Sequence, residues 1–303
     1  MLPAAMAARV SLRAGALGAL AMLAALSACR GGSTLGTTPT GGSREVIENT
    51  EVHLIPRAAN GRDYRITVGL PDSYAAQPER RYPVMYVLDG YWDFKLLKSI
   101  VGGVVYDRVI PEIILVGLGY PGDKPDYDRL RRWDLTPVPD PRPENESKGE
   151  SGHAPELLQV LEREIIPLVD GRYRTDTAYR VLGGSSMGGL FALYTLFSKP
   201  GLFHAYVAPS PAVGYANNWL FGYEEAFARR GEPFTARLYM TAAEKEDAPF
   251  VDAIKRFDAR LRERAYPGLA YEFRIVEGER HSGTKPEAFN RGVRFAFAPR
   301  APL

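Results

Sequence analysis

The stretch Tyr179-Arg180-Val181-Leu182-Gly183-Gly184-Ser185-Ser186-Met187-Gly188-Gly189 decides the fold of this chain. Its first four residues predict a short strand, and the apolar run at residues 190–197 predicts a buried helix directly after it. Between them, Gly184-x-Ser186-x-Gly188 has the spacing of a nucleophile elbow, a tight strand-to-helix turn that exposes a serine hydroxyl. Glycine is expected two residues to either side of Ser186 because side chains there would clash across the turn. Ser186 is therefore predicted to be a nucleophile.

The same turn predicts one half of an oxyanion hole. The backbone amide of Met187 would lie in the first turn of the helix, where amides lack intrahelical acceptors and the helix dipole is positive. A second amide is expected from Tyr91, after the third strand, because Gly90 permits a sharp turn there. The alternative is a phosphate-binding turn. A P-loop has Lys after its last glycine, however, and Leu190 stands at that place.

Strand and helix patterns alternate along the rest of the chain. Eight short segments rich in branched and aromatic side chains predict strands, at residues 51–55, 64–68, 84–88, 113–116, 179–182, 205–208, 237–240 and 271–276. Continuous apolar runs among them are typical of a sheet covered on both faces. Amphipathic patterns at 156–169 and 252–264 predict helices between the later strands. We expect an α/β fold with an eight-stranded, mostly parallel sheet and helices on both faces.

A serine hydroxyl needs a base beside it. In elbow-containing α/β folds the order along the chain is Ser, then acid, then His, and His204 and His281 are the histidines that follow Ser186. His204 comes too early to leave room for an acid-bearing strand, so we expect it to be an ordinary residue at a strand end. His281, in the polar loop after the last strand, is the predicted base.

The acid of the site is expected in the loop after the seventh strand. Three carboxylates lie there within four residues, at Glu244, Glu246 and Asp247. An acid at this place would hold the imidazole tautomer and stabilise the imidazolium. Glu246 is the first choice and Asp247 the second. A solvated charge cluster, with a Ser–His pair working without an acid, is the alternative.

Residues 1–28 have the pattern of an export signal. Arg9 and Arg13 form a basic start, and the apolar run at 14–26 is shorter than the ~20 residues of a membrane span. The run ends Leu26-Ser27-Ala28-Cys29, which resembles the bacterial lipobox, where the cysteine becomes the lipid-modified first residue. Cys29 is the chain's one cysteine, so no intramolecular disulfide can form. A signal peptide with a cysteine near its cut by coincidence is the alternative.

The segment after Cys29 predicts a tether. Residues 29–44 are dominated by Gly, Ser and Thr and cannot build a core, so the catalytic domain is expected over 45–303. A lipid at Cys29 would anchor the exported protein on the periplasmic side of a membrane. Arg30, where enterobacterial lipoproteins retained in the inner membrane have Asp, favours the outer membrane by resemblance.

Composition excludes several classes of protein. The chain is 45% apolar and 24% charged, as ordinary globular proteins are. Its 38 basic and 36 acidic residues nearly balance. This argues against a nucleic-acid partner, because a protein that binds nucleic acid needs a basic surface. Residues 120–152 are polar and rich in proline, so we expect a long loop there, either a solvated insertion or a lid near the site.

Several of these segments together resemble a known family. They are Leu88-Asp89-Gly90, Arg132-Trp133-Asp134-Leu135-Thr136-Pro137, the elbow, Ser210-Pro211 and His281. Over about residues 51–297 the chain is similar to the putative-esterase branch of the α/β-hydrolases, which holds siderophore trilactone esterases, S-formylglutathione hydrolase and mycolyltransferases. The resemblance implies the α/β-hydrolase fold, with Ser186 as nucleophile, His281 as base, and the amides of Tyr91 and Met187 as oxyanion hole. It also places Arg132 near the site.

Three side chains near these motifs carry further expectations. The family's elbow commonly has His where Ser185 stands, and we expect the side chain at 185 to point away from the reacting centre. Asp89 is expected to bond the backbone of its own loop. Substrate binding is expected of Arg132, and the group Arg129, Arg131 and Arg132 could hold an anionic or catecholate group, although surface arginines amid acids are the alternative.

The function expected is that of a serine hydrolase, which cleaves carboxylic esters through an acyl-enzyme. Siderophore trilactones are candidate substrates by resemblance. This chemistry requires neither a metal nor an organic cofactor. An acyltransferase on the same fold is one alternative, and a non-catalytic binding lipoprotein is the other.

Overall fold

The computed structural model describes residues 47–144 and 150–298. The expected signal peptide at 1–28, the lipidation site Cys29 and the tether at 29–44 lie outside these residues. Within the described part, the helices are too short or too polar to cross a bilayer.

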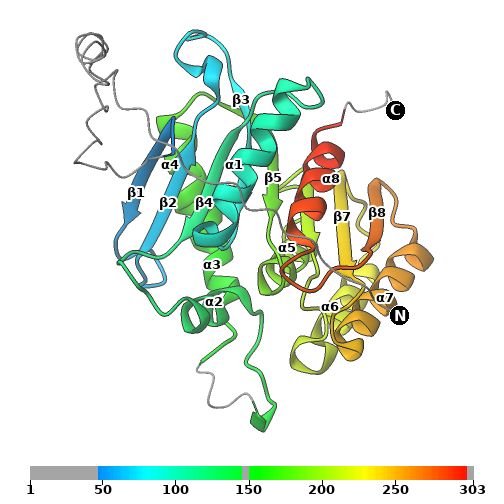
Figure 1. Ribbon diagram of the computed structural model, residues 1–303. Coiled ribbons are helices and arrows are strands. Elements are labelled where there is room, and N and C mark those ends of the chain that lie inside the picture. The colour runs from blue at the N-terminus through cyan, green and yellow to red at the C-terminus, as the bar shows by residue number, and fades with distance from the viewer. Residues whose placement is uncertain (1–46, 145–149, 299–303) are drawn as a thin grey trace, which may run out of the picture. The chain divides into compact units, whose positions relative to one another are not determined.

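One sheet organises the described residues (Figure 1). Its eight strands are β1 (Thr50–Ile55), β2 (Tyr64–Gly69), β3 (Tyr82–Val87), β4 (Ile114–Gly119), β5 (Thr175–Gly183), β6 (Ala205–Pro209), β7 (Ala236–Ala243) and β8 (Leu269–Val276). They lie in the order β1-β2-β4-β3-β5-β6-β7-β8. Strand β2 is antiparallel to β1 and β4, and every other neighbouring pair is parallel. The predicted eight-stranded, mostly parallel sheet is confirmed.

Helices cover both faces of the sheet, as the sequence predicted. Helices α1 (Gly90–Tyr106) and α8 (Lys285–Phe297) pack side by side on one face (Figure 1). The opposite face carries α3 (Ala154–Val160), η3 (Leu161–Ile165), α4 (Ile166–Arg172), α5 (Met187–Ser198), α6 (Tyr215–Ala228) and α7 (Ala248–Arg264). The short helix η1 (Asp72–Tyr74) precedes β3, and α2 (Tyr127–Leu135) follows β4.

Strand β3 shows how the sheet divides the core in two. Val84 and Tyr86 belong to the cluster under α5 and its neighbours, whereas Met85 and Val87 belong to the cluster under α1 and α8. Successive side chains of a strand point to opposite faces. A strand covered on both sides is therefore apolar at every position, and this is why the central strands read as continuous apolar runs.

The helix predicted at 156–169 extends over α3, η3 and α4, and η3 is a π-helical turn. Within it, the Ile166 amide donates to the Leu161 carbonyl, five residues back. Pro167 follows directly. A proline has no amide hydrogen for the carbonyl four residues earlier, and its ring clashes with that carbonyl. The widened turn is the local adjustment that lets the helix continue past the proline.

The expectation of a long loop at 120–152 is wrong in part, because α2 lies within it. Asp126 caps this helix, and its carboxylate accepts from the Arg129 amide at 3.1 Å. Asp134 on the same helix is fully buried, where it accepts from the Tyr64 hydroxyl at 3.0 Å and lies 3.5 Å from Arg62 Nε. The polar residues that suggested a solvated loop are thus partly buried and paired.

Asp134 gives the stability of the fold a pH dependence. Burial raises the pKa of its carboxyl to about 6, against the attraction of Arg62 and hydrogen bonds from tyrosines. The folded protein therefore keeps this proton at pH values where the unfolded chain has lost it. The contribution of Asp134 to the free energy of unfolding falls as pH rises from 3.8 to about 6, and is level above that.

We expect Asp134→Asn, which cannot titrate, to lose this dependence. The free energy of unfolding of the variant minus that of the wild type should be larger at pH 7 than at pH 4 by about 2–3 kcal/mol. Urea unfolding of both proteins at the two pH values measures the change. A constant difference between them would contradict the raised pKa.

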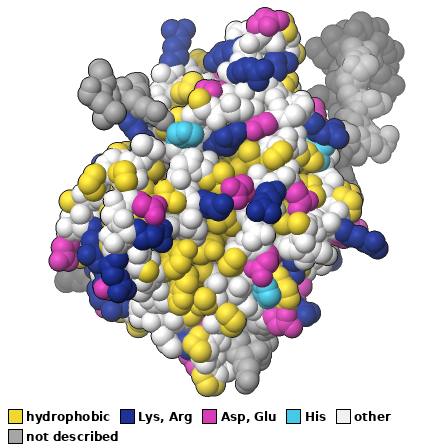
Figure 2. Space-filling model, turned by 180° about the vertical axis from the view of Figure 1, so that it is seen from behind, with side chains coloured by type: hydrophobic (Ala, Val, Ile, Leu, Met, Phe, Trp, Pro, Cys, Tyr) yellow, Lys and Arg dark blue, Asp and Glu magenta, His cyan; other side chains and the backbone are white. Residues whose placement is uncertain are grey.

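Charges of both signs are interspersed on the face seen in Figure 2. Arginines of α7 pair with acidic side chains. Arg260 and Arg264 each lie 3.2 Å from the buried carboxylate of Glu224, and Arg262 lies 2.8 Å from Asp258. Among the described residues on this face, the charges form no continuous basic stripe, in keeping with the balanced composition.

Candidate active site

The predicted nucleophile lies on the turn between β5 and α5. Ser186 has φ 59° and ψ −117°, a conformation that costs free energy for any residue with a side chain. Its amide donates to the Pro209 carbonyl at 3.0 Å, and its carbonyl accepts from the amides of Leu190 and Ala212, both at 2.9 Å. These bonds to the end of β6, to the loop after it and to α5 hold the strained backbone in place.

Close backbone approaches explain the glycines of the turn. A Cβ at Gly184 would lie 2.8 Å from the carbonyl carbon and oxygen of Gly188, so the predicted steric need at 184 is confirmed. At Gly188, a Cβ would meet Leu88 and Asp89 only at 3.4 Å, so the clash predicted at this position is not found. A further tight position is Gly189, where a Cβ would lie 2.8 Å from the ring of Pro211.

We expect Gly184→Ala to destabilise the protein by about 1–3 kcal/mol, because the added methyl group meets backbone that cannot give way. Gly171→Ala is the matched control. A Cβ at Gly171, in α4, would meet nothing within 4 Å, so helix propensity should stabilise that variant by up to about 1 kcal/mol. Chemical unfolding measures both. Equal stability of the two variants would contradict the steric account.

His281 and Glu246 lie together, as the order along the chain suggested. His281 follows β8, and its Nδ1 is hydrogen-bonded to Oε1 of Glu246. The other oxygen of this buried carboxylate accepts from the Ser210 hydroxyl and from the Ala243 amide, both at 2.9 Å. The carboxylate therefore holds a proton on Nδ1 and leaves Nε2 free to accept one.

The other two carboxylates of this loop are placed differently. Glu244 accepts from the Gly278 amide at 2.7 Å, and Asp247 precedes the first turn of α7. His204 was expected to be an ordinary strand-end residue. Its Nδ1 accepts from the Arg180 amide at 3.2 Å, and its ring stacks on Tyr179.

The two predicted oxyanion amides belong to the first turns of α1 and α5. These helices start from β3 and β5, which are parallel neighbours, so both start at the same edge of the sheet. A Cβ at Gly90 would lie 2.8 Å from the Gly117 backbone, and its absence lets α1 start against β4. The amides of Tyr91 and Met187 therefore stand at adjacent helix starts, where amides lack intrahelical acceptors.

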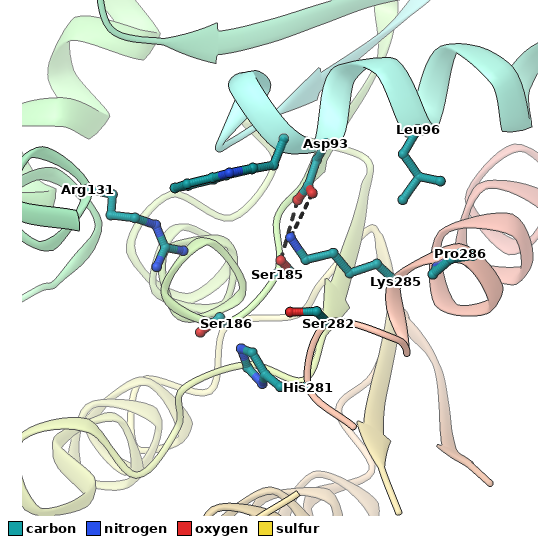
Figure 3. Close-up of a pocket in the computed structure, with 10 residues that line it drawn as sticks. Asp93, Leu96, Arg131, Ser185, Ser186, His281, Ser282, Lys285 and Pro286 are labelled. Carbon is teal, nitrogen blue, oxygen red and sulfur yellow. Dashed lines mark hydrogen bonds and ion pairs between the residues drawn. The ribbon is translucent and has the colours of Figure 1, made fainter. Parts of the chain in front are cut away.

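A pocket of about 370 Å³ opens beside Ser186 (Figure 3). Ser186 and His281 lie next to each other at its floor, and residues of α1, α2 and α8 form its walls. In one wall, buried Asp93 accepts from Lys285 Nζ at 2.8 Å and from the Ser185 hydroxyl at 3.4 Å. Burial raises the pKa of Asp93, and Lys285 opposes the shift. Ser185 turns toward Asp93 but still lines the pocket.

The structure does not place Arg132 in this pocket. Arg132 is buried, with Nη2 3.4 Å from Asp140, and its guanidinium lies 5.9 Å from the Tyr215 ring centre. Its neighbour Arg131 lines the pocket instead. Successive residues of a helix point in different directions, so two adjacent arginines cannot share one environment.

Comparison with known proteins places the chain in a family. Residues 58–260 match a family model described as putative esterase. The chain belongs to the putative esterase family. This esterase is a carboxylic ester hydrolase. Within the described residues it has no cluster of His, Cys, Asp and Glu suited to a metal ion.

Its relatives include named siderophore esterases. The ferri-bacillibactin esterase of Bacillus subtilis (strain 168) is 28% identical over 275 residues, which are 84% of this chain and 92% of that one. The apo-salmochelin esterase of Escherichia coli O6:H1 is 32% identical over 162 residues, 50% of this chain and 48% of that one. The crystal structure of the BES protein from Bacillus cereus has a TM-score of 0.77 and 25% identity, and the match covers 86% of this chain and 100% of that one.

Two features of the esterase's site were not predicted from the sequence. The first is the role of Ser210, whose hydroxyl donates to Glu246 from a backbone with φ 40°. The second is the ion pair of Asp93 and Lys285. A positive φ at a serine gives no signal in the sequence, and the pair joins residues 192 positions apart in the chain.

Proposed function

We propose that the esterase hydrolyses siderophore esters through an acyl-enzyme formed on Ser186. The observation that carries the proposal is the arrangement at the pocket floor. Ser186 lies beside His281, His281 is hydrogen-bonded to buried Glu246, and two helix starts adjoin them. The names of relatives support the substrate class, since two of them are esterases of ferri-bacillibactin and of apo-salmochelin.

In the first half of the proposed reaction, Ser186 Oγ attacks the ester carbonyl carbon while Nε2 of His281 takes the hydroxyl proton. Glu246 stabilises the imidazolium that forms. The carbonyl oxygen becomes an oxyanion, which accepts from the amides of Tyr91 and Met187. When the tetrahedral intermediate collapses, the carbon–oxygen bond to the alcohol breaks, and His281 gives its proton to that alcohol.

In the second half, water replaces the alcohol. His281 removes a proton from the water as it attacks the acyl carbon, and the same two amides hold the new oxyanion. Collapse releases the acid and returns the proton to Ser186. A cyclic trilactone opened in this way would yield a linear chain with one free hydroxyl and one free carboxylate.

The test is a comparison of substrates. The purified esterase and Ser186→Ala are incubated with a trilactone siderophore, iron-free and ferric, and with nitrophenyl acetate, and products are identified by mass spectrometry. Linear siderophore formed by the wild type alone supports the proposal. Hydrolysis of nitrophenyl acetate without trilactone opening would overturn the substrate class. A transferase would instead give acylated product when an acceptor alcohol is added.

We also propose that the protein is exported and anchored through a lipid on Cys29, with the outer membrane favoured. The sequence pattern at residues 1–29 supports this proposal. The test expresses wild type and Cys29→Ala in a bacterium fed an alkyne fatty acid. We expect only the wild type to carry the label and to be found in the membrane fraction. A density gradient that separates the inner from the outer membrane then shows which of the two holds the protein. Label retained by Cys29→Ala would contradict the assignment.

A further inference from the structure

A lysine in the wall of the pocket belongs to the segment that carries His281 (Figure 3). Lys285 is the first residue of α8 and follows His281 closely in the chain. Its Nζ donates to Asp93 Oδ1 at 2.8 Å. An ammonium group has three N–H donors, and Asp93 is the one acceptor that the described residues give to it. The other donors therefore remain for a molecule bound in the pocket.

The ion pair presents its positive end to the pocket. The Asp93 side chain is 1% exposed, whereas that of Lys285 is 19% exposed. Asp93 Oδ2 accepts from the Ser185 hydroxyl at 3.4 Å, so each carboxylate oxygen already has a donor. A free lysine side chain loses conformational freedom when it binds a ligand. Because Asp93 holds Lys285 in place beforehand, little of that loss accompanies binding.

The alcohol part of the ester lies beside this lysine in the proposed reaction. His281 gives its proton to the oxygen of the leaving alcohol, so that oxygen must lie against the imidazole. His281, Ser282, Lys285 and Pro286 all line the pocket. A substituent near the leaving oxygen therefore lies next to this segment and its ammonium group.

A carboxylate is the substituent that suits this wall. Hydrogen bonds between an ammonium and a carboxylate are charge-assisted, and they are about twice as strong as those between neutral groups. The attraction between the two charges is also stronger in a pocket than in open water, because less solvent screens it. The wall should therefore favour an anionic ester over a neutral ester of the same shape.

A second cation lines the pocket from another element. Arg131 of α2 donates from Nε and Nη2 to the two oxygens of Asp89, at 2.9 Å and 2.6 Å. The expectation that Asp89 bonds the backbone of its own loop is therefore wrong. Arg131 and Lys285 enter from opposite sides of the view in Figure 3, and Lys285 belongs to the segment of His281. Lys285 is thus the cation on the alcohol side.

We propose that Lys285 is a specificity-determining residue of the esterase, which binds a carboxylate on the alcohol part of the substrate while Asp93 holds it in place. The proposal rests on the proposed function, in which His281 protonates the leaving alcohol. A hydroxy acid that is esterified through its hydroxyl group is such an alcohol. The linear chain formed when a trilactone opens ends in one, so its last ester bond fits the site. The anionic group considered for the arginines of α2 is thus assigned to Lys285.

The test compares two acetate esters that differ only in one charge. They are 3-acetoxypropanoate, whose alcohol carries a carboxylate, and 3-acetoxypropanamide, whose alcohol carries a neutral amide of nearly the same shape. Release of acetate, followed by NMR, gives kcat/KM for each. We expect the wild type to prefer the carboxylate at least about tenfold, mainly through a lower KM. The ratio of the two values in one sample does not depend on how much of the protein is folded.

Lys285→Met should bring this ratio to within about twofold of unity. Because that variant leaves Asp93 buried without its cation, the double variant Asp93→Asn/Lys285→Met is measured beside it, and the same result is expected. Lys285→Arg keeps the charge and should retain at least about a third of the preference. Lys95→Met is the matched control, because Lys95 is an exposed lysine of α1 that does not line the pocket. This control should keep the wild-type ratio.

A wild-type ratio near unity would overturn the proposal. A preference that survives in the double variant would do so too, since another cation would then hold the carboxylate. An equal loss in Lys95→Met would mean a diffuse attraction of the surface, which also contradicts the proposal. The same holds if nitrophenyl acetate is hydrolysed and 3-acetoxypropanoate is not. Failure of the wild type to react with a fluorophosphonate, a probe of active serines, would instead defeat the proposed function. Failure to open a trilactone would defeat only its substrate class.

Discussion

Replacing Ser186 with alanine is expected to abolish ester hydrolysis, with kcat falling by about 10⁶-fold, because no other group can form the acyl-enzyme. The residual rate would come from binding and from the oxyanion amides alone. Hydrolysis of nitrophenyl acetate measures the loss, and a fluorophosphonate probe should label the wild type but not Ser186→Ala.

The neighbouring serine provides a control for labelling. The Ser185 hydroxyl is buried and faces Asp93, at 3.4 Å from its Oδ2. Ser185→Ala should therefore still react with the fluorophosphonate. Labelling that persists in Ser186→Ala and disappears in Ser185→Ala would show that Ser185, and not Ser186, is the nucleophile.

Replacing Glu246 with glutamine should lower kcat by about 10³–10⁴-fold and leave KM nearly unchanged. An amide at this position removes the charge that stabilises the imidazolium. The amide nitrogen can also donate to Nδ1 of His281, which favours the tautomer that carries its proton on Nε2. In that tautomer Nε2 cannot accept the proton of the Ser186 hydroxyl. Kinetics with nitrophenyl acetate, on protein whose folding is checked by circular dichroism, give the result.

Glu244→Gln is the matched control for Glu246→Gln. Glu244 lies in the same loop, and its carboxylate accepts from the Gly278 amide. This variant should keep kcat within about threefold of the wild-type value. Full activity in Glu246→Gln would mean that Ser186 and His281 work as a pair without an acid, which is the alternative that the sequence left open.

Much of the sheet could be predicted from the sequence because each strand has a local signal. The run Ile114-Leu115-Val116 is apolar at every position, as burial on both faces requires. Helix α2 could not be predicted in the same way. Its Arg132 and Asp134 are buried through ion pairs and hydrogen bonds, so the apolar period that signals an amphipathic helix is missing.

Site residues could be predicted where motif spacing or the order along the chain identifies them. They could not be predicted where contacts between distant elements determine which side chains meet. The elbow spacing indicated Ser186, and the order rule led to His281. Arg132 was predicted to lie near the site, whereas Arg131 of the same helix lines the pocket, because a helix must be docked before its inward side is known. Asp93 and Lys285 meet only when α1 and α8 pack together, so neither gives a local signal.

The hydrogen bonds around the elbow also determine when its strain arises. The Ser186 amide donates to Pro209, and the Ala212 amide donates to Ser186. Both bonds tie the turn to the centre of the sheet, so the unfavourable torsions are imposed once, as the chain folds, and do not recur with each catalytic cycle. In deuterium oxide, we expect these two amide protons to be replaced only when the whole domain opens.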